Sequence, residues 1–400
     1  MSLIATGDYM GAARIMLRDN PLSGICGRVC THPCESRCRR GSEDEAMNIC
    51  ELKRFATDWA YAQGFPYDED LKPQADIDKR VAIIGAGPAG LTCAGDLAKK
   101  GYEVKIFEAL HKAGGVLEYG IPEFRLPKET VVASEVENIK KLGVEIETNV
   151  IIGKTITIDE LFEDEGFDAV FIGSGAGLPK FMGIPGEQAN GVFSANEFLT
   201  RVNLMKAFDE SYDTPVSIGK KVAIIGGGNV AMDAARTALR LGSESHIVYR
   251  RALEQLPARA EEVHHAQEEG IIFDILTNPV EILTDENGNV SGMKCIKMEL
   301  GEPDESGRRS PIAIEGSEFV MDVDTVIMSL GTSPNPLISS HTPGLEVNKR
   351  KCLVAEEETG LTTREAVYAG GDAVTGAATV ILAMGAGKKA AAAIDEYLSK

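Results

Sequence analysis

The sequence predicts an α/β protein with two Rossmann-like units behind an N-terminal helical segment. An apolar strand runs into a glycine-rich turn and a helix twice, at Gly85-Ala-Gly-Pro-Ala-Gly90 and at Gly226-Gly-Gly-Asn-Val-Ala231. In addition, five cysteines within residues 26–50 set the N-terminal segment apart. In each turn the bare glycine backbone lets a pyrophosphate reach the helix N-terminus, where free N–H groups and the helix dipole favour anions.

The residue that ends the second strand of each unit differs in charge. Glu108 follows the first turn at the distance where a carboxylate can bind a pair of ribose hydroxyls. Arg250 occupies the same place in the second unit, and Arg251 follows it. A cation there cannot accept a hydrogen bond from a hydroxyl, but it can pair with a 2′-phosphate. The sequence therefore predicts two different dinucleotides, the second being NADP(H). A plain strand–turn–helix and a surface charge pair remain the alternatives.

The cysteine group predicts a metal centre. Cys26, Cys30, Cys34 and Cys38 are each separated by three residues, and Cys50 follows. An iron–sulfur cluster needs about four thiolates or near equivalents. Zinc also accepts four thiolates, although its usual spacing is tighter pairs, and buried free thiols or disulfides are further alternatives. Five candidates for four positions leave one unassigned, and the pattern does not say which.

Composition limits the class of protein. The chain has 400 residues, 44% of them hydrophobic, which is typical of a globular protein with two or three domains. A net charge of −20 argues against a nucleic-acid partner or an anionic membrane surface. The sequence shows no apolar run of roughly 18 residues and no signal peptide at its start. We therefore expect a cytoplasmic protein without a membrane span.

Strands and helices alternate from residue 79 onwards, as expected for parallel sheets. Strands are predicted at 81–85, 104–108, 144–150 and 168–173 in the first unit, and at 222–226, 246–250 and 271–276 in the second. Residues 284–322 alternate in polarity and contain turn sequences at 286–289 and 304–307, which predicts antiparallel strands. A long helix is predicted from about Ala378.

The N-terminal segment, residues 1–72, has the pattern of short helices, the clearest over 48–63, and residues 64–78 are predicted to be a linker. Near the other end, Gly371-Asp372 follows an apolar strand, so that Asp372 is placed to bind a flavin ribityl hydroxyl; an ordinary β-turn is the alternative. No Cys-x-x-Cys occurs, which argues against a flavin–disulfide relay.

Several longer motifs follow one another in order along nearly the whole chain. They are Asn20–Cys30, Leu52–Ala56, Gly85–Leu91, Gly114–Lys128 with its run Gly-Ile-Pro-Glu-Phe-Arg-Leu-Pro-Lys, Ile225–Asp233, Val248–Arg251 and Ala369–Asp372. Together they resemble the small (β) subunit of NADPH-dependent glutamate synthase and its relatives, which include nicotinamide-binding subunits of bifurcating transhydrogenases.

The resemblance implies FAD at the first turn, NADP(H) at the second and a [4Fe-4S] cluster in the helical domain. It implies that the second nucleotide-binding domain is inserted in the first: 1–75 is the helical iron–sulfur domain, 76–178 and 330–400 the FAD domain, and 179–329 the NAD(P)H domain. Family members usually carry an earlier cysteine group, and the two groups together bind two clusters. This chain begins just after the place of that group, so we expect one cluster rather than two.

The resemblance also assigns roles to residues. Glu108 holds the FAD adenosine ribose, Asp372, Thr379 and Val380 lie along the ribityl chain and ring, and Arg250 and Arg251 hold the 2′-phosphate. The candidate cofactor-binding residues are Gly85, Gly87, Pro88, Ala89, Gly90, Glu108, Gly115, Arg125, Gly226, Gly228, Asn229, Val230, Arg250, Arg251, Gly371, Asp372, Thr379 and Val380. No catalytic side chain is expected, because the cofactors carry the redox chemistry.

The implied activity is that of an FAD-dependent NAD(P)H oxidoreductase subunit. Electrons pass between NADPH, FAD and the cluster, to or from a larger partner subunit such as a glutamate synthase large chain. A ferredoxin-linked bifurcating transhydrogenase, a stand-alone reductase of a small molecule and a non-catalytic assembly subunit are the alternatives. The sequence does not fix the direction of electron flow.

Overall fold

The computed structural model describes residues 1–65, 77–303 and 307–400. The chain folds into two compact units. Unit 1 contains residues 1–118, 123–178 and 333–400, and unit 2 contains residues 119–122 and 179–332. The N-terminal helices thus belong to the same compact unit as the first glycine turn. Most of the predicted linker 64–78 and of the turn 304–307 lies outside the described residues.

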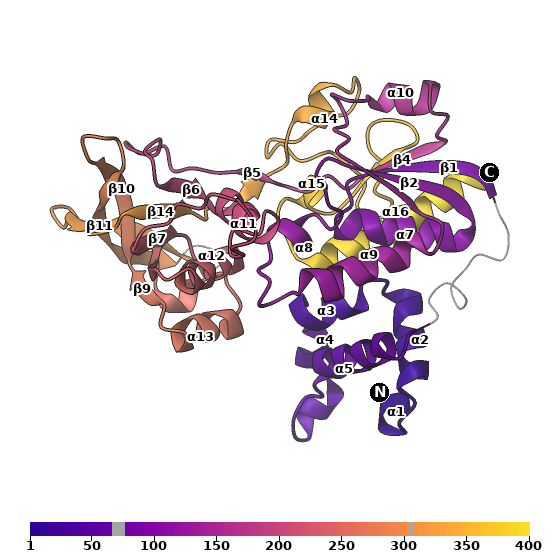
Figure 1. Cartoon of the computed structure of the whole chain (residues 1–400), viewed down its shortest axis with the longest axis horizontal. Helices are drawn as coiled ribbons and strands as arrows, with labels where there is room; N and C mark the ends of the chain where they lie inside the picture. Colours follow the sequence, from indigo (N-terminus) through magenta and orange to yellow (C-terminus); the bar gives the residue numbers. More distant parts are fainter. Residues whose placement is uncertain (66–76, 304–306) are drawn as a thin grey trace. The chain divides into compact units, whose positions relative to one another are not determined.

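Short helices make up the N-terminal part of unit 1 (Figure 1). They are α1 (Ser2–Ala5), α2 (Tyr9–Asp19), α3 (Ser23–Val29), α4 (Pro33–Ser36), η1 (Arg39–Ser42) and α5 (Ile49–Ala62). This agrees with the predicted helical segment, and α5 matches the helix predicted over 48–63. Leu17, Leu22 and Ile25 are fully buried, so this segment has a hydrophobic core to which α2, α3 and the turn between them contribute.

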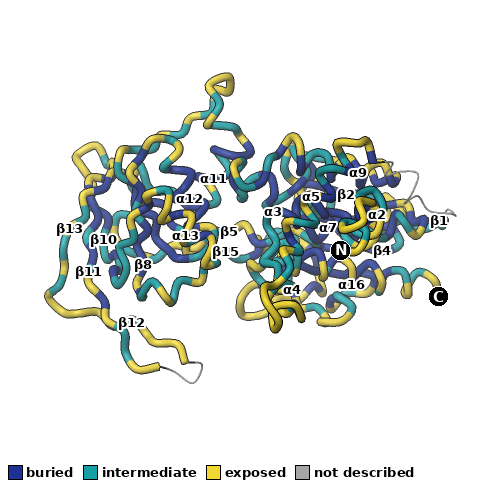
Figure 2. Tube along the Cα trace, turned by 90° about the horizontal axis from the view of Figure 1, so that it is seen from below, coloured by how far each residue is buried: buried dark blue, intermediate teal, exposed yellow. Residues whose placement is uncertain are grey.

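A five-stranded parallel sheet forms the centre of unit 1, in the order β16-β4-β1-β2-β3. Its strands are β1 (Ile77–Ile84), β2 (Tyr102–Glu108), β3 (Glu145–Thr148), β4 (Ala169–Ile172) and β16 (Val367–Ala369). Apolar side chains at 81–84, 104–107 and 169–172 are mostly buried, which explains why these runs form central strands (Figure 2).

The helices and short elements around this sheet complete unit 1. They are α7 (Pro88–Lys100), α8 (Val116–Tyr119), the π-helical turn η2 (Lys128–Val132), α9 (Ala133–Lys140), α10 (Ile158–Glu163), α14 (Leu337–Ser340), α15 (Asp372–Thr375) and α16 (Val380–Leu398). A separate pair of short strands, β5 (Leu178–Pro179) and β15 (Thr332–Ser333), forms where the chain passes from one unit to the other. Helices α7 and α16 pack closely, because glycine at position 387 lets α16 approach the backbone of Ala89.

Unit 2 repeats the architecture with a second parallel sheet, in the order β6-β14-β7-β8-β9. Its elements are β6 (Val192–Ser194), α11 (Ala195–Asn203), β7 (Lys221–Ile225), α12 (Asn229–Arg240), β8 (Glu244–Tyr249), η3 (Leu253–Gln255), α13 (Ala260–Glu268), β9 (Ile272–Ile275) and β14 (Thr325–Met328). An antiparallel sheet of β10 (Thr277–Thr284), β11 (Val290–Pro303), β12 (Arg309–Ala313) and β13 (Phe319–Met321) follows β9.

The α/β class with two parallel sheets is confirmed, and so are the antiparallel strands and the turn at 286–289. Strands β6 and β14 were not predicted. Both are short, and β14 has only the four-residue run Thr325–Met328 to mark it, although it pairs with β7 at the centre of the sheet. Among the described residues, none of the helices is long and apolar enough to cross a membrane.

Candidate dinucleotide and iron–sulfur sites

The first glycine turn joins β1 to α7 in a conformation that needs glycine. Gly85 has φ +100°, and a Cβ added there would lie 2.7 Å from the carbonyl oxygen of Gly173, at the end of β4. A Cβ on Gly90 would overlap the carbonyl oxygen of Gly85. Both positions therefore exclude larger residues, and the tight turn brings the start of α7 to the carboxyl edge of the sheet.

The space in front of α7 is open. Gly87 is the extended N-cap residue of α7, and a Cβ built on it would meet no heavy atom within 4 Å. No side chain caps this helix, and Pro88 and Ala89 are its first residues. Gly115 packs against Gly87, its own added Cβ being 3.0 Å from the Cα of Gly87. An uncapped helix N-terminus beside open space fits a dinucleotide pyrophosphate.

Glu108 ends β2 and lies over this turn. Its Oε2 accepts from the backbone N–H of Ala86 at 2.7 Å, and its Oε1 accepts from the N–H of Leu110 at 2.8 Å. Burial raises the pKa of Glu108, whereas the backbone N–H groups act to lower it. Each carboxylate oxygen keeps a second lone pair. The side chain is therefore fixed by the turn and still able to accept from ribose hydroxyls.

The C-terminal segment of unit 1 contributes the other predicted residues of this site. Gly371 has φ +65°, and a Cβ there would come within 3.1 Å of the Cβ of Ala89, which places Asp372 near the start of α7. Asp372 Oδ1 accepts from the N–H of Ala378 at 3.1 Å, and burial raises the pKa of Asp372. Thr379 caps α16 by accepting from Leu382 N, and Val380 is its first residue.

Arg125 is a predicted residue of the first site that none of the contacts described above involves. It is half-buried in the stretch between α8 and η2. The remaining predicted residues of the first site converge on the start of α7 and on the carboxyl ends of β2 and β16, so this part of unit 1 fits FAD.

The second glycine turn, between β7 and α12, has the same backbone design. Gly226 has φ +143°, and a Cβ there would overlap the carbonyl oxygen of Ser329, at the end of β14. Gly228 is the extended N-cap of α12, no side chain caps the helix, and an added Cβ would meet nothing within 4 Å. Asn229 and Val230 begin the helix. This turn therefore also fits a pyrophosphate.

The two arginines after β8 lie in different surroundings. Arg250 is exposed, and none of the interactions found among the described residues involves its side chain. Arg251 is buried, and its Nε donates to the carbonyl oxygen of Arg309 at 3.1 Å, on the neighbouring β12. The sequence suggested an equivalent pair. In the structure Arg250 is exposed at the end of β8, whereas the Nε of Arg251 is bound to the backbone of β12.

A loop that sequence reasoning missed closes on the second turn. Ala258 N donates to Gly227 O at 3.1 Å, and Arg259 N donates to Asn229 Oδ1 at 2.9 Å. The side chain of Asn229 therefore anchors the loop that leads into α13. The signal available in the sequence was a proline, Pro257, directly before a polar helix, which marks a turn but does not identify its partner.

Two of the five clustered cysteines point inward. Cys26 is fully buried on α3, and its Sγ lies 3.4 Å from the Sδ of Met384 on α16. Cys50 is buried at the start of α5, and its thiol donates to the carbonyl oxygens of Cys26 and Gly27 at 3.5 Å. Burial raises the pKa of Cys26 to about 12 and also raises that of Cys50. Both side chains are directed into the domain.

The other three cysteines lie nearer the surface. Cys34 is exposed, and Cys30 and Cys38 are partly exposed. The backbone N–H of His32 donates to the Cys30 sulfur at 3.3 Å. Hydrogen bonds from the backbone of Met47 and Arg40 lower the pKa of Cys38. N–H groups directed at sulfur favour the thiolate, which is the form that binds metals.

The described residues do not bring four thiols to one point. Within residues 1–65, 77–303 and 307–400, no group of three or more His, Cys, Asp or Glu side chains is placed to hold a metal ion. All eight cysteines are free thiols. In this arrangement the described part of the segment does not supply a complete ligand set.

Comparison with known proteins defines the class. Residues 79–394 match the pyridine nucleotide-disulphide oxidoreductase family, and residues 1–65 match dihydropyrimidine dehydrogenase domain II, a 4Fe-4S cluster domain. FprA from Mycobacterium tuberculosis, solved in complex with NADPH, shares the fold: its TM-score is 0.66 at 20% identity, over 80% of this chain and 85% of that chain. The chain belongs to this family and is a flavoprotein oxidoreductase that binds FAD and NAD(P)H, with a 4Fe-4S domain in front.

Closer relatives define the branch of the family. The glutamate synthase [NADPH] small chain of Halomonas elongata is 37% identical over 100% of this chain and 84% of its own length. The NADP(+)-dependent formate dehydrogenase subunit beta of Moorella thermoacetica is 42% identical over 99% of this chain, but the chain spans only 57% of that protein. The predicted resemblance to glutamate synthase small subunits is therefore confirmed.

Proposed function

We propose that this chain is the NADPH-binding flavoprotein subunit of a larger electron-transfer enzyme and passes electrons to or from a partner subunit. The observation that carries the proposal is the contrast between two glycine turns of the same design. A buried carboxylate, Glu108, lies at the first turn and an exposed cation, Arg250, follows the strand next to the second. The first suits the ribose of FAD, and the second suits the 2′-phosphate that distinguishes NADPH from NADH.

The protein's part in the chemistry is binding and orientation. The N–H groups at the start of α7 and α12 bind the two pyrophosphates, Glu108 accepts from the adenosine ribose of FAD, and Asp372 accepts from its ribityl chain. FAD, when bound, supplies the exchange between two-electron hydride transfer and one-electron steps. None of these roles needs a side chain that exchanges protons with a substrate.

Cys30, Cys34 and Cys38 are the ligands that this segment offers to a 4Fe-4S cluster. Their sulfurs lie near the surface, and two of them receive backbone N–H groups. Cys26 and Cys50 are directed into the domain and are less suited to the role. The full ligand set then needs at least one further ligand, brought by a rearrangement of this segment or by another chain.

The partner follows from the relatives. Their names describe a small chain of glutamate synthase and a beta subunit of an NADP-dependent formate dehydrogenase, each of which implies a second chain. We propose a larger partner subunit that accepts or donates electrons, in the cytoplasm. A subunit of a ferredoxin-linked bifurcating transhydrogenase is the alternative to this proposal.

Anaerobic purification with co-purifying chains tests the proposal. We expect FAD, iron and acid-labile sulfide in the protein, and NADPH should bleach the flavin. Serine at Cys30 or Cys34 should abolish delivery of electrons to the partner and leave flavin reduction by NADPH intact. Zinc without sulfide, or full partner reduction by both serine variants, would show that the cysteines are structural. A flavin that NADPH does not bleach would favour a non-catalytic assembly subunit.

A further inference from the structure

The loop of residues 252–259 is built onto the second glycine turn. Besides the bonds from Ala258 N to Gly227 O and from Arg259 N to Asn229 Oδ1, the side chain of Leu256 packs on the turn. A Cβ added at Gly227 would lie 2.5 Å from Leu256 Cδ2. The loop therefore has a fixed position at the start of α12, where the turn is open to a pyrophosphate.

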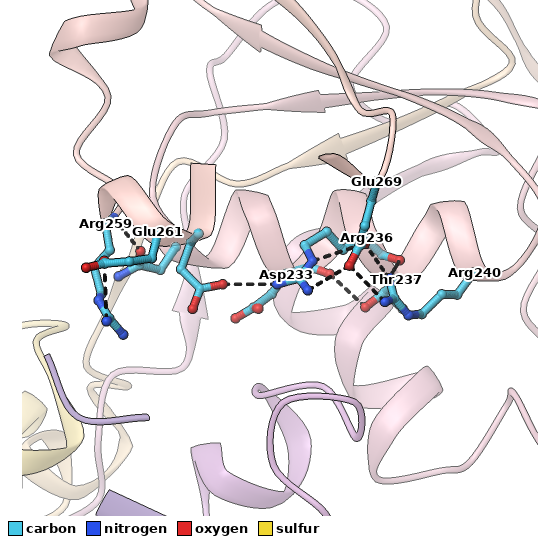
Figure 3. A network of polar contacts seen from close by, with 9 residues as sticks. Asp233, Arg236, Thr237, Arg240, Arg259, Glu261 and Glu269 are labelled. Atoms are coloured by element: carbon cyan, nitrogen blue, oxygen red, sulfur yellow. Dashed lines mark hydrogen bonds and ion pairs between the residues drawn. The ribbon is translucent and has the colours of Figure 1, made fainter. Parts of the chain in front are cut away.

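Ion pairs between α12 and α13 hold the far side of this loop. Arg236 on α12 pairs with Glu262 at 3.1 Å and with Glu269 at 2.8 Å, and Arg240 pairs with Glu269 at 2.6 Å. These arginines lower the pKa of Glu269 to about 2. Figure 3 shows this network, with Arg259 and Glu261 at one end and Arg240 and Glu269 at the other. Arg259, the N-cap residue of α13, is thus fixed against α12.

Arg259 is the basic residue of the loop 252–259, and the loop contacts fix its backbone at the start of α12. Its own backbone N–H contacts Asn229, the first residue of α12, and its guanidinium lies 3.4 Å from Glu261. The side chain of Glu261 is exposed, and an exposed ion pair contributes little free energy, so a doubly charged pyrophosphate can replace this carboxylate. Arg250, by contrast, lies at the end of β8, the position for the 2′-phosphate.

We propose that Arg259 binds the pyrophosphate of the nicotinamide dinucleotide, while Arg250 alone recognises the 2′-phosphate and Arg251 positions the β11–β12 hairpin. This inference rests on the proposed function, because it assigns residues within its NADPH site. It divides the affinity for the nicotinamide nucleotide into two parts that can be measured separately. Arg259 contributes equally to NADPH and NADH, and Arg250 contributes to NADPH alone.

Binding measurements with three probes separate the two parts. Isothermal titration would give the dissociation constants of NADPH and NADH, and 2′-AMP would serve as a competitor that carries the 2′-phosphate without the pyrophosphate. Arg259→Ala should weaken NADPH and NADH alike, by roughly tenfold to a hundredfold, and leave 2′-AMP unchanged. Arg250→Ala should weaken NADPH and 2′-AMP by a similar factor and leave NADH unchanged.

Two further variants serve as controls. Lys220→Ala removes an exposed cation just before β7, at the opposite end of the parallel strands from the turn, and should change none of the three constants. Arg259→Lys keeps the charge and should restore part of the affinity, so that a folding defect in Arg259→Ala can be recognised.

The possible results discriminate clearly. This inference would be overturned if Arg259→Ala bound NADH as tightly as the unmodified protein, or if it lost affinity only for NADPH and 2′-AMP. Either result would leave the proposed function in place. An unmodified protein that binds neither NADPH nor NADH would overturn both.

Discussion

The two glycine turns share a backbone and differ in what surrounds it. Gly85 and Gly226 both adopt a positive φ beneath the carbonyl oxygen that ends a neighbouring strand, and Gly87 and Gly228 both leave the helix N-terminus open. The difference lies in the second strand of each unit, which ends in a buried, hydrogen-bonded Glu108 or leads into an exposed Arg250. We propose that the backbone provides a general phosphate site and that one side chain beyond it selects the cofactor.

The turns also differ in how tightly their helices pack. The third small residue is Gly90 in the first turn, where an added Cβ would overlap Gly85 O, whereas Ala231 occupies that place in the second and is fully buried without strain of this kind. In the first unit, α16 also packs against α7 at Gly387. The first turn therefore tolerates less change than the second.

Substitution of the third residue should have the largest effect. Gly90→Ala forces the helix away from the turn, and we expect loss of FAD together with a destabilisation at or above the upper end of the about 1–3 kcal/mol typical of overpacking. The matched change Ala231→Gly should cost only about 1 kcal/mol, from helix propensity, and keep NADPH binding. Flavin content and thermal unfolding measure both. Normal FAD content in Gly90→Ala would show that the first turn is as tolerant as the second.

Reversing the charge at the second strand end should have the next largest effect. Arg250→Glu replaces attraction to the 2′-phosphate by repulsion, so the preference for NADPH over NADH should fall by more than the roughly tenfold to hundredfold expected for simple removal of the charge. Steady-state kcat/KM for the two nucleotides reports this ratio. An equal loss for both would mean that Arg250 does not distinguish them.

A buried carboxylate gives the first unit a pH dependence through the N-terminal helices. Glu135 on α9 accepts from the N–H groups of Gly24 and Ile25, at the start of α3, and from the hydroxyl of Tyr61. Burial raises the pKa of Glu135 to about 7, although these donors oppose the shift. Between about pH 4.5 and 7 the folded state then binds more protons than the unfolded state.

The stability of this segment should therefore fall as pH rises through that window, by at most about 1.4 kcal/mol per pH unit for one proton. Glu135→Gln should flatten the dependence. Urea unfolding followed through the fluorescence of Trp59, the single tryptophan of the chain, reports on α5 directly. A slope that persists unchanged in Glu135→Gln would assign it to other groups.

We expect the smallest effect on cofactor affinity from substitutions of the first residue of each helix, Asn229 in α12 and Pro88 in α7. Asn229→Ala removes the acceptor that anchors Arg259 N, a bond worth about 0.5–1.5 kcal/mol, so both nicotinamide nucleotides should bind a few-fold to tenfold more weakly. Pro88, which begins α7, has no side chain that can accept a hydrogen bond, so Pro88→Ala should leave FAD affinity nearly unchanged. If Asn229→Ala lost no more affinity for the nicotinamide nucleotides than Pro88→Ala loses for FAD, the loop of residues 252–259 that Asn229 anchors would not contribute to nucleotide binding.

Much of the fold and of the two dinucleotide sites was predictable from the sequence, because the residues concerned lie close to one another along the chain. The glycine turns, Glu108 and Arg250 are close in sequence to the strands that place them, so spacing alone located them. The contacts that were missed join distant segments. Arg251 turns toward Arg309, Arg259 toward Asn229, and Cys26 toward Met384. No periodicity within one segment signals such a partner. The four-residue strand β14 escaped for a related reason, since its place is fixed by pairing with β7 and β6.

The strand order of unit 1 has a consequence for how the protein is made. Strand β16 and the residues that follow it, including Asp372 and Thr379, leave the ribosome after every strand of the parallel sheet of unit 2, because those strands lie between Val192 and Met328. At about 5–20 residues per second, several seconds separate completion of that inner sheet from completion of the outer one. Unit 2 can therefore fold first, while the parallel sheet of unit 1 is incomplete and β4 has no partner strand on the side where β16 will pair with it. The predicted FAD residues Asp372 and Thr379 are thus made after all the strands of the parallel sheet of unit 2.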